Sequence, residues 1–358
     1  RDLHSFPTRR SSDLRGTRAR DIGRCGGTRG QETCPTGTRC LSPCPTLVPS
    51  FPHPTMKKAG EIGMFENEMK KGHKPPGTPA KKAKKLFIQE MNTKAQQIGL
   101  TRSRFVEPAG FPSTTEQVMS TRDMLKLMIY ASRYQELAAI WNKKIYAMKI
   151  HGREARELTV QTTVRLPQIE AEYEILGAKT GAIWGTNEMD GFHIVLLFAA
   201  PDGKKYAAAL RGAASPAKRA RDLKIAMDNA LILEKNPKAK VQDIESESAA
   251  VCRLPDQSEF NPKADLPLIF SKNADVPGHP ASVTKLMTAV TALDYVSGLE
   301  EQFMIQETDI TPGMGDYFLP GDILTLKDLL YGMMLPSSNT CATAMARIAG
   351  EKIAARLN

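Results

Sequence analysis

Apolar residues recur at helical spacing in two stretches of the first half of the chain. The first stretch begins near Leu86 and is closed by Gly99, a residue type that commonly ends helices. Its apolar members are Phe87, Met91, Ala95 and Ile98. The second stretch follows Ser120 and Thr121, either of which can cap a helix, with Asp123 near the positive end of the helix dipole. Its apolar members are Met124, Leu127, Met128 and Ala131. Both patterns predict helices with one buried face.

From about residue 158 the period changes to that of β-structure. Residues 158–164 alternate between apolar and polar, and three short, mostly apolar runs follow. These runs are 179–184, 192–199 and 206–210. Asp202-Gly203 separates the last two and predicts a hairpin turn. We therefore expect an antiparallel meander, followed by a helix over 215–233.

The last hundred residues predict one strand and three helices. The strand is 266–270, and the helices are 281–293, 326–334 and 340–357. The chain stops inside the third helix at Asn358, without a capping residue. We therefore expect the continuation of this helix elsewhere in the chain, near Leu86.

Composition divides the chain into four segments. Residues 1–55 are rich in Arg, Gly, Pro, Ser and Thr and lack periodicity, and residues 56–85 are polar, basic and contain proline. Together they predict a disordered leader over 1–85. The run Phe6–Leu14 resembles a translated sequencing adapter, so we interpret this leader as non-native. Residues 235–261 are polar and contain proline, which predicts a linker. The folded segments are then 86–234 and 262–358.

The net charge of +10 belongs to the leader. Residues 1–85 hold 18 Lys and Arg against 7 Asp and Glu, a charge of +11, which leaves −1 for the other 273 residues. Because no aromatic residues are interleaved with these charges, nucleic-acid binding is disfavoured. No apolar run is long enough for a transmembrane helix, and no signal peptide opens the chain.

Four of the six cysteines also lie in the leader, and none of them has the Cys-x-x-Cys spacing of a zinc site. They are Cys25, Cys34, Cys40 and Cys44. The other two, Cys252 and Cys341, are single and far apart in the sequence. We expect Cys341 to be a small buried residue rather than a nucleophile.

Ser282 and Lys285 form a Ser-x-x-Lys pair at the start of the helix predicted over 281–293. Residues three apart share one face of a helix, so the hydroxyl and the amine lie within reach of each other. A serine hydroxyl is a weak nucleophile until a base removes its proton, and a lysine serves as that base when burial lowers its pKa. On its own the pair is also common on ordinary solvent-facing helices.

Two further motifs place polar groups at a predicted turn and on a predicted strand. Ser337–Asn339 (Ser-Ser-Asn) precedes an alanine-rich helix, where it is also an ordinary cap. Lys179–Gly181 (Lys-Thr-Gly) combines a cation, a hydroxyl and a residue without a side chain. That combination suits an edge strand along which a carboxylate-bearing substrate lies, although alone it is also a common strand-turn fragment.

The three motifs together are typical of penicillin-binding proteins and class A β-lactamases. The residues on either side of the motifs favour one of these protein families over the other. Residues 279–288 and 329–339 closely resemble the nucleophile helix and second motif of the D-alanyl-D-alanine carboxypeptidases of peptidase family S11, the low-molecular-weight penicillin-binding proteins. Residues 87–105 resemble the family's region after the second motif, and 192–233 resemble its closing strands and helix.

The resemblance covers about 86–234 and 262–358, in the reverse of the family's order. The first two motifs are 55 positions apart. Once the segments are rejoined in the family's order, the third motif falls 113 positions after Asn339, which reproduces the family's short gap followed by a longer one. We therefore interpret the chain as a circularly permuted member, either natural or produced during sequence assembly, and the adapter-like leader favours assembly.

The resemblance implies an α/β (α+β) fold of the β-lactamase/transpeptidase type. An antiparallel sheet flanked by helices would pack on an all-helical part, with the site between them. It also implies that Ser282 attacks the substrate carbonyl, that Lys285 is the base, and that the backbone N–H groups of Ser282 and Ala182 form the oxyanion hole. Ser337 would relay the proton to the leaving amine, while Asn339 orients Lys285 and the substrate.

By the same resemblance, Lys179 and Thr180, beside Gly181, would bind the terminal carboxylate of the substrate. No metal or other cofactor is expected. The chain departs from the family in two places: Thr340 stands where many relatives have an acidic residue, and Ile183 stands where a threonine is frequent. Neither replaces a motif residue.

The activity implied is that of a serine D-Ala-D-Ala carboxypeptidase acting on peptidoglycan pentapeptides and inhibited by β-lactams, at the outer face of the bacterial cytoplasmic membrane or in the periplasm. The resemblance also allows a peripheral association with the membrane, for which the sequence shows no segment. One alternative is a serine β-lactamase, which needs a carboxylate to activate water; Glu107 lies in a loop, but nothing in the sequence marks it for this role. Another is an inactive peptidoglycan-binding protein or a misassembled product.

Overall fold

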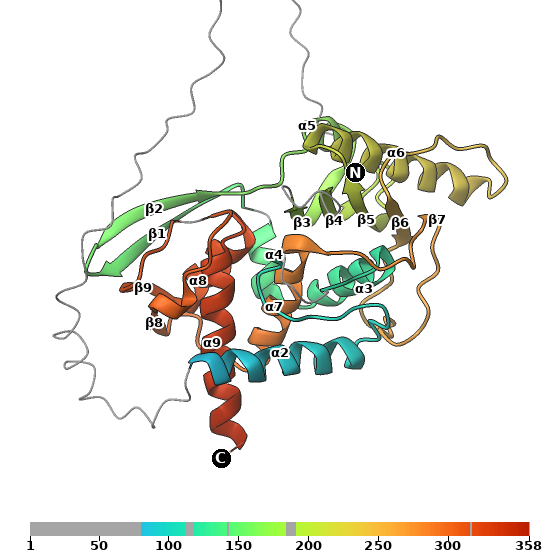
Figure 1. The fold of residues 1–358 in the computed structure, drawn as a ribbon. Coiled ribbons are helices and arrows are strands. Elements are labelled where there is room, and N and C mark those ends of the chain that lie inside the picture. Colours follow the sequence, from blue (N-terminus) through green and yellow to red (C-terminus); the bar gives the residue numbers. More distant parts are fainter. Residues whose placement is uncertain (1–79, 112–116, 142, 184–190, 316, 358) are drawn as a thin grey trace, which may run out of the picture. The chain divides into compact units, whose positions relative to one another are not determined.

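In the computed structural model, residues 80–111, 117–141, 143–183, 191–315 and 317–357 are described. All of them lie in one unit, His73–Asn358. The unit combines two antiparallel sheets with helices on both sides of the larger sheet (Figure 1). This confirms the predicted α/β (α+β) arrangement. The four cysteines of the leader, Trp184 and most of the leader itself lie outside the described residues.

The larger sheet contains five strands in the order β3-β4-β5-β6-β7, each antiparallel to its neighbours. They are β3 (Glu174–Ile183), β4 (Gly191–Ala199), β5 (Lys205–Ala213), β6 (Ser248–Arg253) and β7 (Phe270–Lys272). The strand order equals the chain order, so each of β4 to β7 pairs with the strand that precedes it. The predicted meander over β3, β4 and β5 is confirmed.

Strand β6 corrects the prediction that residues 235–261 form a linker. Its residues 249–252 (Ala-Ala-Val-Cys) are fully buried between β5 and β7. A strand buried on both faces shows no alternation of polar and apolar residues, and this one is only six residues long within a polar stretch. Polar composition on either side therefore concealed it.

Helix α6 (Pro216–Lys235) covers one face of this sheet, and helix α3 (Thr121–Ala131) lies on the other (Figure 1). The hydroxyl of Ser215 accepts a hydrogen bond from the Lys218 amide and begins α6. The hydroxyl of Ser120 likewise accepts from the Asp123 amide and begins α3, as predicted. Alternate residues of the strands therefore enter two separate apolar clusters, one under each helix layer.

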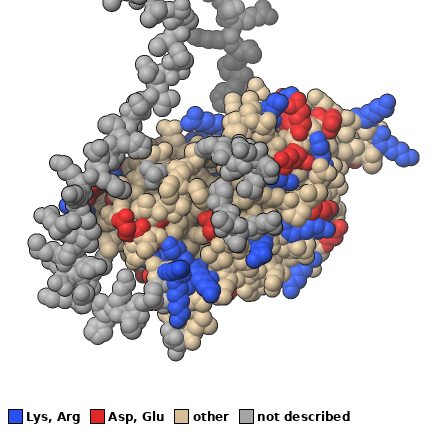
Figure 2. Space-filling model, viewed as in Figure 1, with Lys and Arg blue, Asp and Glu red and all other residues tan. Residues whose placement is uncertain are grey.

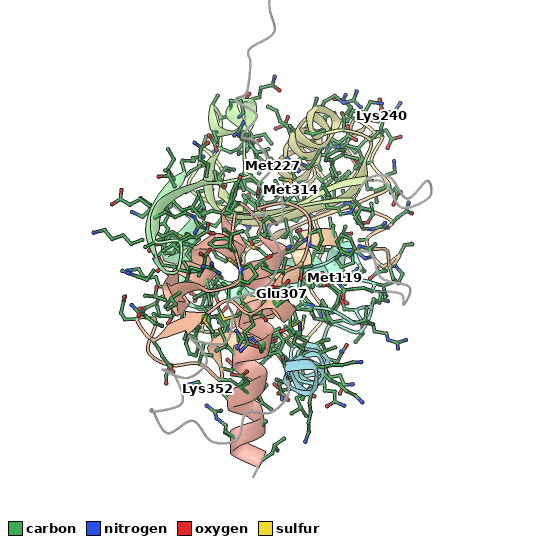
Figure 3. The ribbon with its side chains drawn as sticks, turned by 60° about the vertical axis from the view of Figure 1, so that its left-hand side comes forward. Met119, Met227, Lys240, Glu307, Met314 and Lys352 are labelled. Carbon is green, nitrogen blue, oxygen red and sulfur yellow. The ribbon has the colours of Figure 1, made fainter. Side chains whose placement is uncertain are left out.

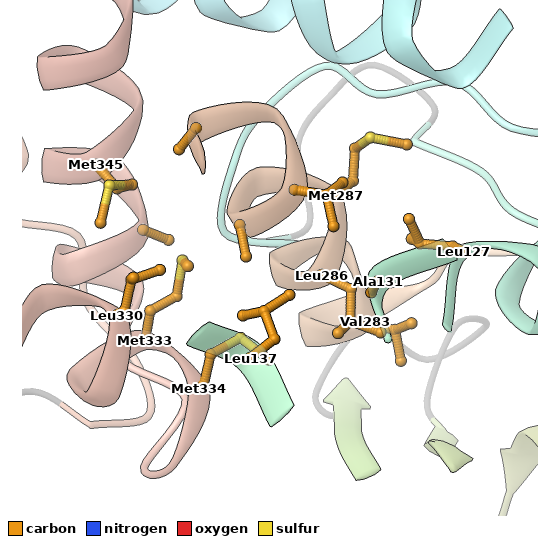
Figure 4. Close-up of a cluster of buried hydrophobic side chains, with 14 of the residues drawn as sticks. Leu127, Ala131, Leu137, Val283, Leu286, Met287, Leu330, Met333, Met334 and Met345 are labelled. Atoms are coloured by element: carbon orange, nitrogen blue, oxygen red, sulfur yellow. The ribbon is translucent and has the colours of Figure 1, made fainter. Parts of the chain in front are cut away.

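The helical part holds the nucleophile region at its centre. It consists of α2 (Ala80–Gln97), α3, α4 (Gln135–Trp141), η1 (Ala281–Val283), α7 (Thr284–Leu293), α8 (Leu326–Met334) and α9 (Asn339–Leu357). Leu286 and Met287 of α7 pack among side chains from α3, α4, α8 and α9 (Figure 4). Every residue of α7 from Thr284 to Ala292 is buried, so this helix is fixed from all sides. Cys341 is fully buried here, as expected.

A second, four-stranded sheet has the order β2-β1-β9-β8. Its strands are β1 (Ile145–Gly152), β2 (Arg156–Gln161), β8 (Gln302–Met304) and β9 (Asp322–Thr325). Two short helices complete the described elements, α5 (Pro167–Glu170) and η2 (Glu307–Asp309). β1 and β2 form a largely exposed hairpin, which explains why β1 lacks the apolar pattern that would have predicted it.

The start of helix α2 and its relation to the last helix differ from the predictions. Helix α2 begins at Ala80 rather than Leu86. It does not continue α9: the two helices pack across each other, and a Cβ added to Gly350 of α9 would lie 2.0 Å from the carbonyl oxygen of Ala83 in α2 (Figure 1). The expectation of one helix divided between the two ends is therefore wrong.

Charged side chains of both signs are distributed over the visible face of the described part (Figure 2). Lys240 and Lys352 extend outward at opposite ends of the molecule, from the segment after α6 and from α9 (Figure 3). Among the described residues, no helix is both long and apolar enough to cross a membrane.

Candidate active site

Ser282 lies at the junction of η1 and α7, and Lys285 lies on the first turn of α7. The Lys285 Nζ is 2.9 Å from the Ser282 Oγ. Ser282 is partly exposed, whereas Lys285 is fully buried. The one-turn spacing predicted from the sequence therefore brings the hydroxyl and the amine into hydrogen-bond contact.

Lys285 has two further partners, both of which can only accept hydrogen bonds. Its Nζ donates to the Ala109 carbonyl oxygen at 2.5 Å and to the Asn339 Oδ1 at 2.8 Å. A neutral amine has two N–H groups and one lone pair, whereas an ammonium has three N–H groups. When Lys285 is neutral, these two acceptors take both N–H groups, so the lone pair is left facing the Ser282 hydroxyl.

Burial favours the neutral form of this lysine. Desolvation lowers the pKa of Lys285 to about 7, while the negative charge of Glu107 opposes the decrease. Cys341 is a weaker opposing influence, and burial itself raises the pKa of that thiol to about 12. A substantial fraction of Lys285 is therefore an uncharged amine at neutral pH.

Lys179 and Ser337 form a second pair. The Lys179 Nζ donates to the Ser337 Oγ at 2.8 Å and to the Thr180 carbonyl at 3.1 Å. Lys179 is fully buried, and desolvation together with the charges of Lys285 and Arg219 places its pKa well below the usual value. The strand motif and the turn motif, which are 158 positions apart in the sequence, are thus brought together on one side of the nucleophile.

The backbone beside the nucleophile and the turn motif is held in an unusual conformation. Ala281 has φ of 49° and Ser337 has φ of 68°, in the left-handed region that residues with a side chain rarely adopt. The Nδ1 of His279 accepts a hydrogen bond from the Ala281 amide at 3.0 Å. Burial lowers the pKa of His279 to about 4, which keeps the ring neutral and able to accept this bond.

Strand β3 passes close to the nucleophile. A Cβ on Gly181 would lie 3.0 Å from the Pro280 carbonyl oxygen and 3.1 Å from the Cβ of Ala281, so the absence of a side chain permits this approach. Ala182 follows on the same strand, opposite Phe192 of β4, and is partly exposed. The five-stranded sheet therefore presents its free edge, strand β3, to Ser282.

Asn339 joins the lysine to a loop that passes over the turn motif. Its Oδ1 accepts from Lys285, and its Nδ2 donates to the Pro312 carbonyl at 2.8 Å. A Cβ on Gly313 would lie 2.4 Å from that Nδ2, and one on Gly315 would lie 2.8 Å from the backbone of Ser338. The amide orientation of Asn339 is thus fixed from both sides.

Thr180 also has a partner that the three motifs do not include. Its hydroxyl lies 2.6 Å from the hydroxyl of Thr163, which follows β2. The Thr163 amide donates to the Leu335 carbonyl at the end of α8. Thr163 has no motif around it in the sequence, and its position becomes evident only when β3 is placed beside the end of α8.

The loop from Phe105 to Phe111 supplies the Ala109 carbonyl to Lys285, a contact that was not predicted from the sequence. Gly110 in this loop has φ of 81°, and a Cβ there would lie 1.9 Å from the Ala281 carbonyl oxygen. The Glu-Pro-Ala-Gly sequence at 107–110, with a glycine after a proline, was the available signal.

Comparison with known proteins identifies the family. The family model of the D-alanyl-D-alanine carboxypeptidases, peptidase family S11, matches residues 81–188 and 267–354, more than half of the chain. The chain belongs to this family. The S11 match comes as two separate segments, consistent with the permuted order predicted from the sequence.

One curated relative of this S11 protein is the D-alanyl-D-alanine endopeptidase of Escherichia coli (strain K12), which is 42% identical over 50 residues. The matched part covers 14% of this chain and 16% of the relative, so it spans about one sixth of that protein's length. No solved structure matches the chain. Among the described residues, no group of three or more His, Cys, Asp or Glu side chains is placed to hold a metal ion.

Proposed function

We propose that this S11 protein is a serine D-Ala-D-Ala peptidase, and specifically a carboxypeptidase, that acts through an acyl-enzyme. The observation that carries the proposal is the hydrogen bond between the Lys285 amine and the Ser282 hydroxyl, at 2.9 Å. The Ala109 and Asn339 oxygens occupy both N–H groups of the neutral amine. Only its lone pair is left for Ser282, so the serine hydroxyl donates and the amine accepts.

In the first step, neutral Lys285 removes the proton from the Ser282 hydroxyl while the oxygen attacks the carbonyl carbon between the two terminal D-alanines. The C–O bond forms, and the carbonyl oxygen takes the negative charge. We assign the backbone N–H groups of Ser282 and Ala182 to this oxyanion. Loss of one such donor typically lowers the rate by about 10²–10³.

In the second step, the C–N bond breaks and the leaving amine takes a proton. Ser337 is suited to pass this proton, because its hydroxyl accepts from Lys179 and so can direct its own O–H elsewhere. Lys179 and Thr180, on the β3 edge beside Gly181, would bind the terminal carboxylate of the substrate. The proton that reaches the leaving amine through Ser337 is the one that Lys285 took from Ser282, so Lys285 is neutral again. Water then attacks the ester carbonyl, Lys285 accepts a proton from that water, and it returns this proton to the Ser282 oxygen as the ester C–O bond breaks.

The same site would take β-lactams, whose amide carbonyl occupies the position of the peptide carbonyl. A β-lactamase function is less well supported, because the carboxylate considered for water activation is already used. The Oε2 of Glu107 accepts from the Ala109 amide at 2.9 Å, and its Oε1 accepts from the Phe111 amide at 2.5 Å. A carboxylate bound in this way is a poor base for an additional water.

An endopeptidase function is a second candidate, since the E. coli relative carries that name. Both reactions break a bond on the carbonyl side of a D-alanine and would use the same serine. They differ in the size of the leaving group, a single D-alanine or a longer peptide. Peptidoglycan stem peptides are the proposed substrate in either case, which places the proposed site of action in the bacterial periplasm or at the outer face of the cytoplasmic membrane.

The test is covalent labelling of the full chain with a fluorescent penicillin, beside a Ser282→Ala control. Labelling that requires Ser282 is the expected result. Incubation with a D-Ala-D-Ala pentapeptide and with a cross-linked dimer, followed by mass spectrometry, then separates the two peptidase functions. A cooperatively folded protein that is not labelled and releases no D-alanine would refute the proposal and leave a binding protein as the interpretation.

A further inference from the structure

The loop from Phe105 to Phe111 is attached to the nucleophile helix at several points. The Pro108 carbonyl accepts from the Thr288 hydroxyl at 2.6 Å, and the Ala109 carbonyl accepts from Lys285. Gln117 adds another link, because its Nε2 donates to the Thr284 hydroxyl at 2.9 Å while its Oε1 accepts from the loop backbone. The loop and α7 therefore form one hydrogen-bonded assembly.

Glu107 lies inside this loop and binds the loop's own backbone. Its carboxylate accepts hydrogen bonds from the amides of Ala109 and Phe111, on either side of Gly110. Hydrogen bonds from backbone amides favour the ionised form, whereas burial disfavours it and raises the pKa of Glu107. The side chain thus fixes the peptide groups on both sides of the Ala109–Gly110 peptide.

The peptide between these two bound amides contacts the active-site lysine. It carries the Ala109 carbonyl, which accepts from the Lys285 Nζ at 2.5 Å, and its two neighbouring peptides donate their N–H groups to Glu107. Because each peptide is planar, fixing the neighbours on both sides fixes the direction of this carbonyl. If this peptide rotated, the oxygen would leave the lysine.

The charge of Glu107 also acts on Lys285 directly. The charged or titratable groups that influence this amine come from three elements: Glu107 from the loop, Lys179 from β3 and Cys341 from α9. Of these, Glu107 is the anion that favours the protonated lysine, and Lys179 acts in the opposite direction. The remaining partners of the amine are neutral oxygens of Ser282, Ala109 and Asn339.

We propose that Glu107 is a positioning residue for the proposed acylation reaction, which holds the Ala109 carbonyl on Lys285 through the loop backbone and supplies the negative charge of the loop. It does not touch the substrate. This inference rests on the proposed function for its effect on rate, but its effect on the lysine can be measured without any reaction.

The first experiment compares Glu107→Gln with the wild-type full chain. The amide has a similar shape but lacks the charge, and its NH₂ group cannot accept a hydrogen bond. With ε-¹³C-labelled lysine, NMR titration follows Lys285, whose signal is assigned through Lys285→Arg. We expect the midpoint of Lys285 to fall by about one pH unit, since removing an anion favours the neutral amine. The matched control is Glu259→Gln, because Glu259 is exposed and its carboxylate makes no hydrogen bond or ion pair with the described residues.

The second readout is the acylation rate with a fluorescent penicillin as a function of pH. Glu107→Gln should be acylated about 10–100-fold more slowly at pH 8, because the lone pair is no longer directed at Ser282. The ratio of the wild-type rate to the variant rate should decrease toward pH 5, because a larger fraction of Lys285 stays neutral in the variant than in the wild type at that pH. A purely structural role would lower the rate by the same factor at every pH.

An unchanged Lys285 midpoint in a cooperatively melting Glu107→Gln protein would overturn the proposal, and so would a deficit that does not vary with pH. If this variant fails to melt cooperatively, Glu107→Asp provides the test. It keeps the charge but is one methylene shorter, so the Lys285 midpoint should stay near that of the wild type while acylation slows. Wild-type acylation in Glu107→Asp would refute the positioning role. If neither the wild-type protein nor any variant is acylated, the proposed function is refuted. The NMR titration of Lys285 still tests the role of Glu107 in that case.

Discussion

The pH dependence of acylation provides the most direct test of the lysine as base. Only the neutral amine can remove the Ser282 proton, so the acylation rate should follow its fraction. With a pKa of about 7 for Lys285, roughly half of the amine is neutral at pH 7, about 9% at pH 6 and about 1% at pH 5. An ordinary lysine would be neutral in fewer than about one molecule in a thousand at pH 7.

The sign follows from the direction of the shift. Burial lowers the pKa, so the active form dominates above pH 7 and is lost as the pH falls through that value. We therefore expect a plateau above about pH 8 and a loss of about 100-fold between the plateau and pH 5. Stopped-flow measurement of acylation by a fluorescent penicillin gives this profile, and circular dichroism at each pH shows whether the fold persists.

Lys285→Arg is the matched variant, because it keeps a long cationic side chain that cannot lose its proton. It should be acylated at least about 10³-fold more slowly than the wild type at pH 8. A wild-type rate that stays constant from pH 5 to pH 8, or one that rises only above pH 9, would show that Lys285 is not the base or is not neutral near pH 7.

Three substitutions test the supporting structure. Arg347→Met should lower the free energy of unfolding by about 3–5 kcal/mol in urea titrations, because it leaves the fully buried Asp309 carboxylate without its bidentate partner; a loss below 1 kcal/mol would contradict this. Gly350→Ala should destabilise the protein by about 1–3 kcal/mol despite the better helix propensity of alanine, since its Cβ would overlap the Ala83 backbone; a gain in melting temperature would show that α2 does not pack there. Gly110→Ala should abolish penicillin labelling, because the new Cβ would meet backbone atoms beside the nucleophile at 1.9 Å; normal labelling would exclude this close approach.

The sequence predicted the elements whose residues alternate or repeat on one buried face. Helix α8 was predicted at its observed bounds, α9 within one residue of them, and β4 from the run 192–199. The helix predicted from 281 is η1 followed by α7. Strands β1 and β6 were missed for opposite reasons, since one is exposed on most of its length and the other is buried on both faces. In β1 burial does alternate, but its exposed positions include the apolar residues Ile145 and Ala147, which hide the period of two in the sequence. In β6 burial on both faces removes that period.

At the site, the sequence predicted the side chains that belong to motifs but not the groups that support them. The three motifs identified residues whose side chains the structure brings together, including Lys285 with Asn339 and Lys179 with Ser337. The contribution of Ala109 could not be predicted, because it comes from a backbone carbonyl whose direction depends on a turn. Thr163 and Glu107 act on other residues of the protein, so no motif records them.

The order of strands in the larger sheet has a consequence for how the molecule is built. Because β3 to β7 pair as successive neighbours, the sheet closes through contacts that are short in sequence, which form rapidly. Helices α2 and α3 instead need α7 and α9, which follow the whole sheet in the chain. During synthesis from the N-terminus, the strand motif is therefore in place before the nucleophile is made, and the last helices assemble the site on a finished template. Pulse-labelling hydrogen exchange should accordingly show protection in β4 and β5 before α7.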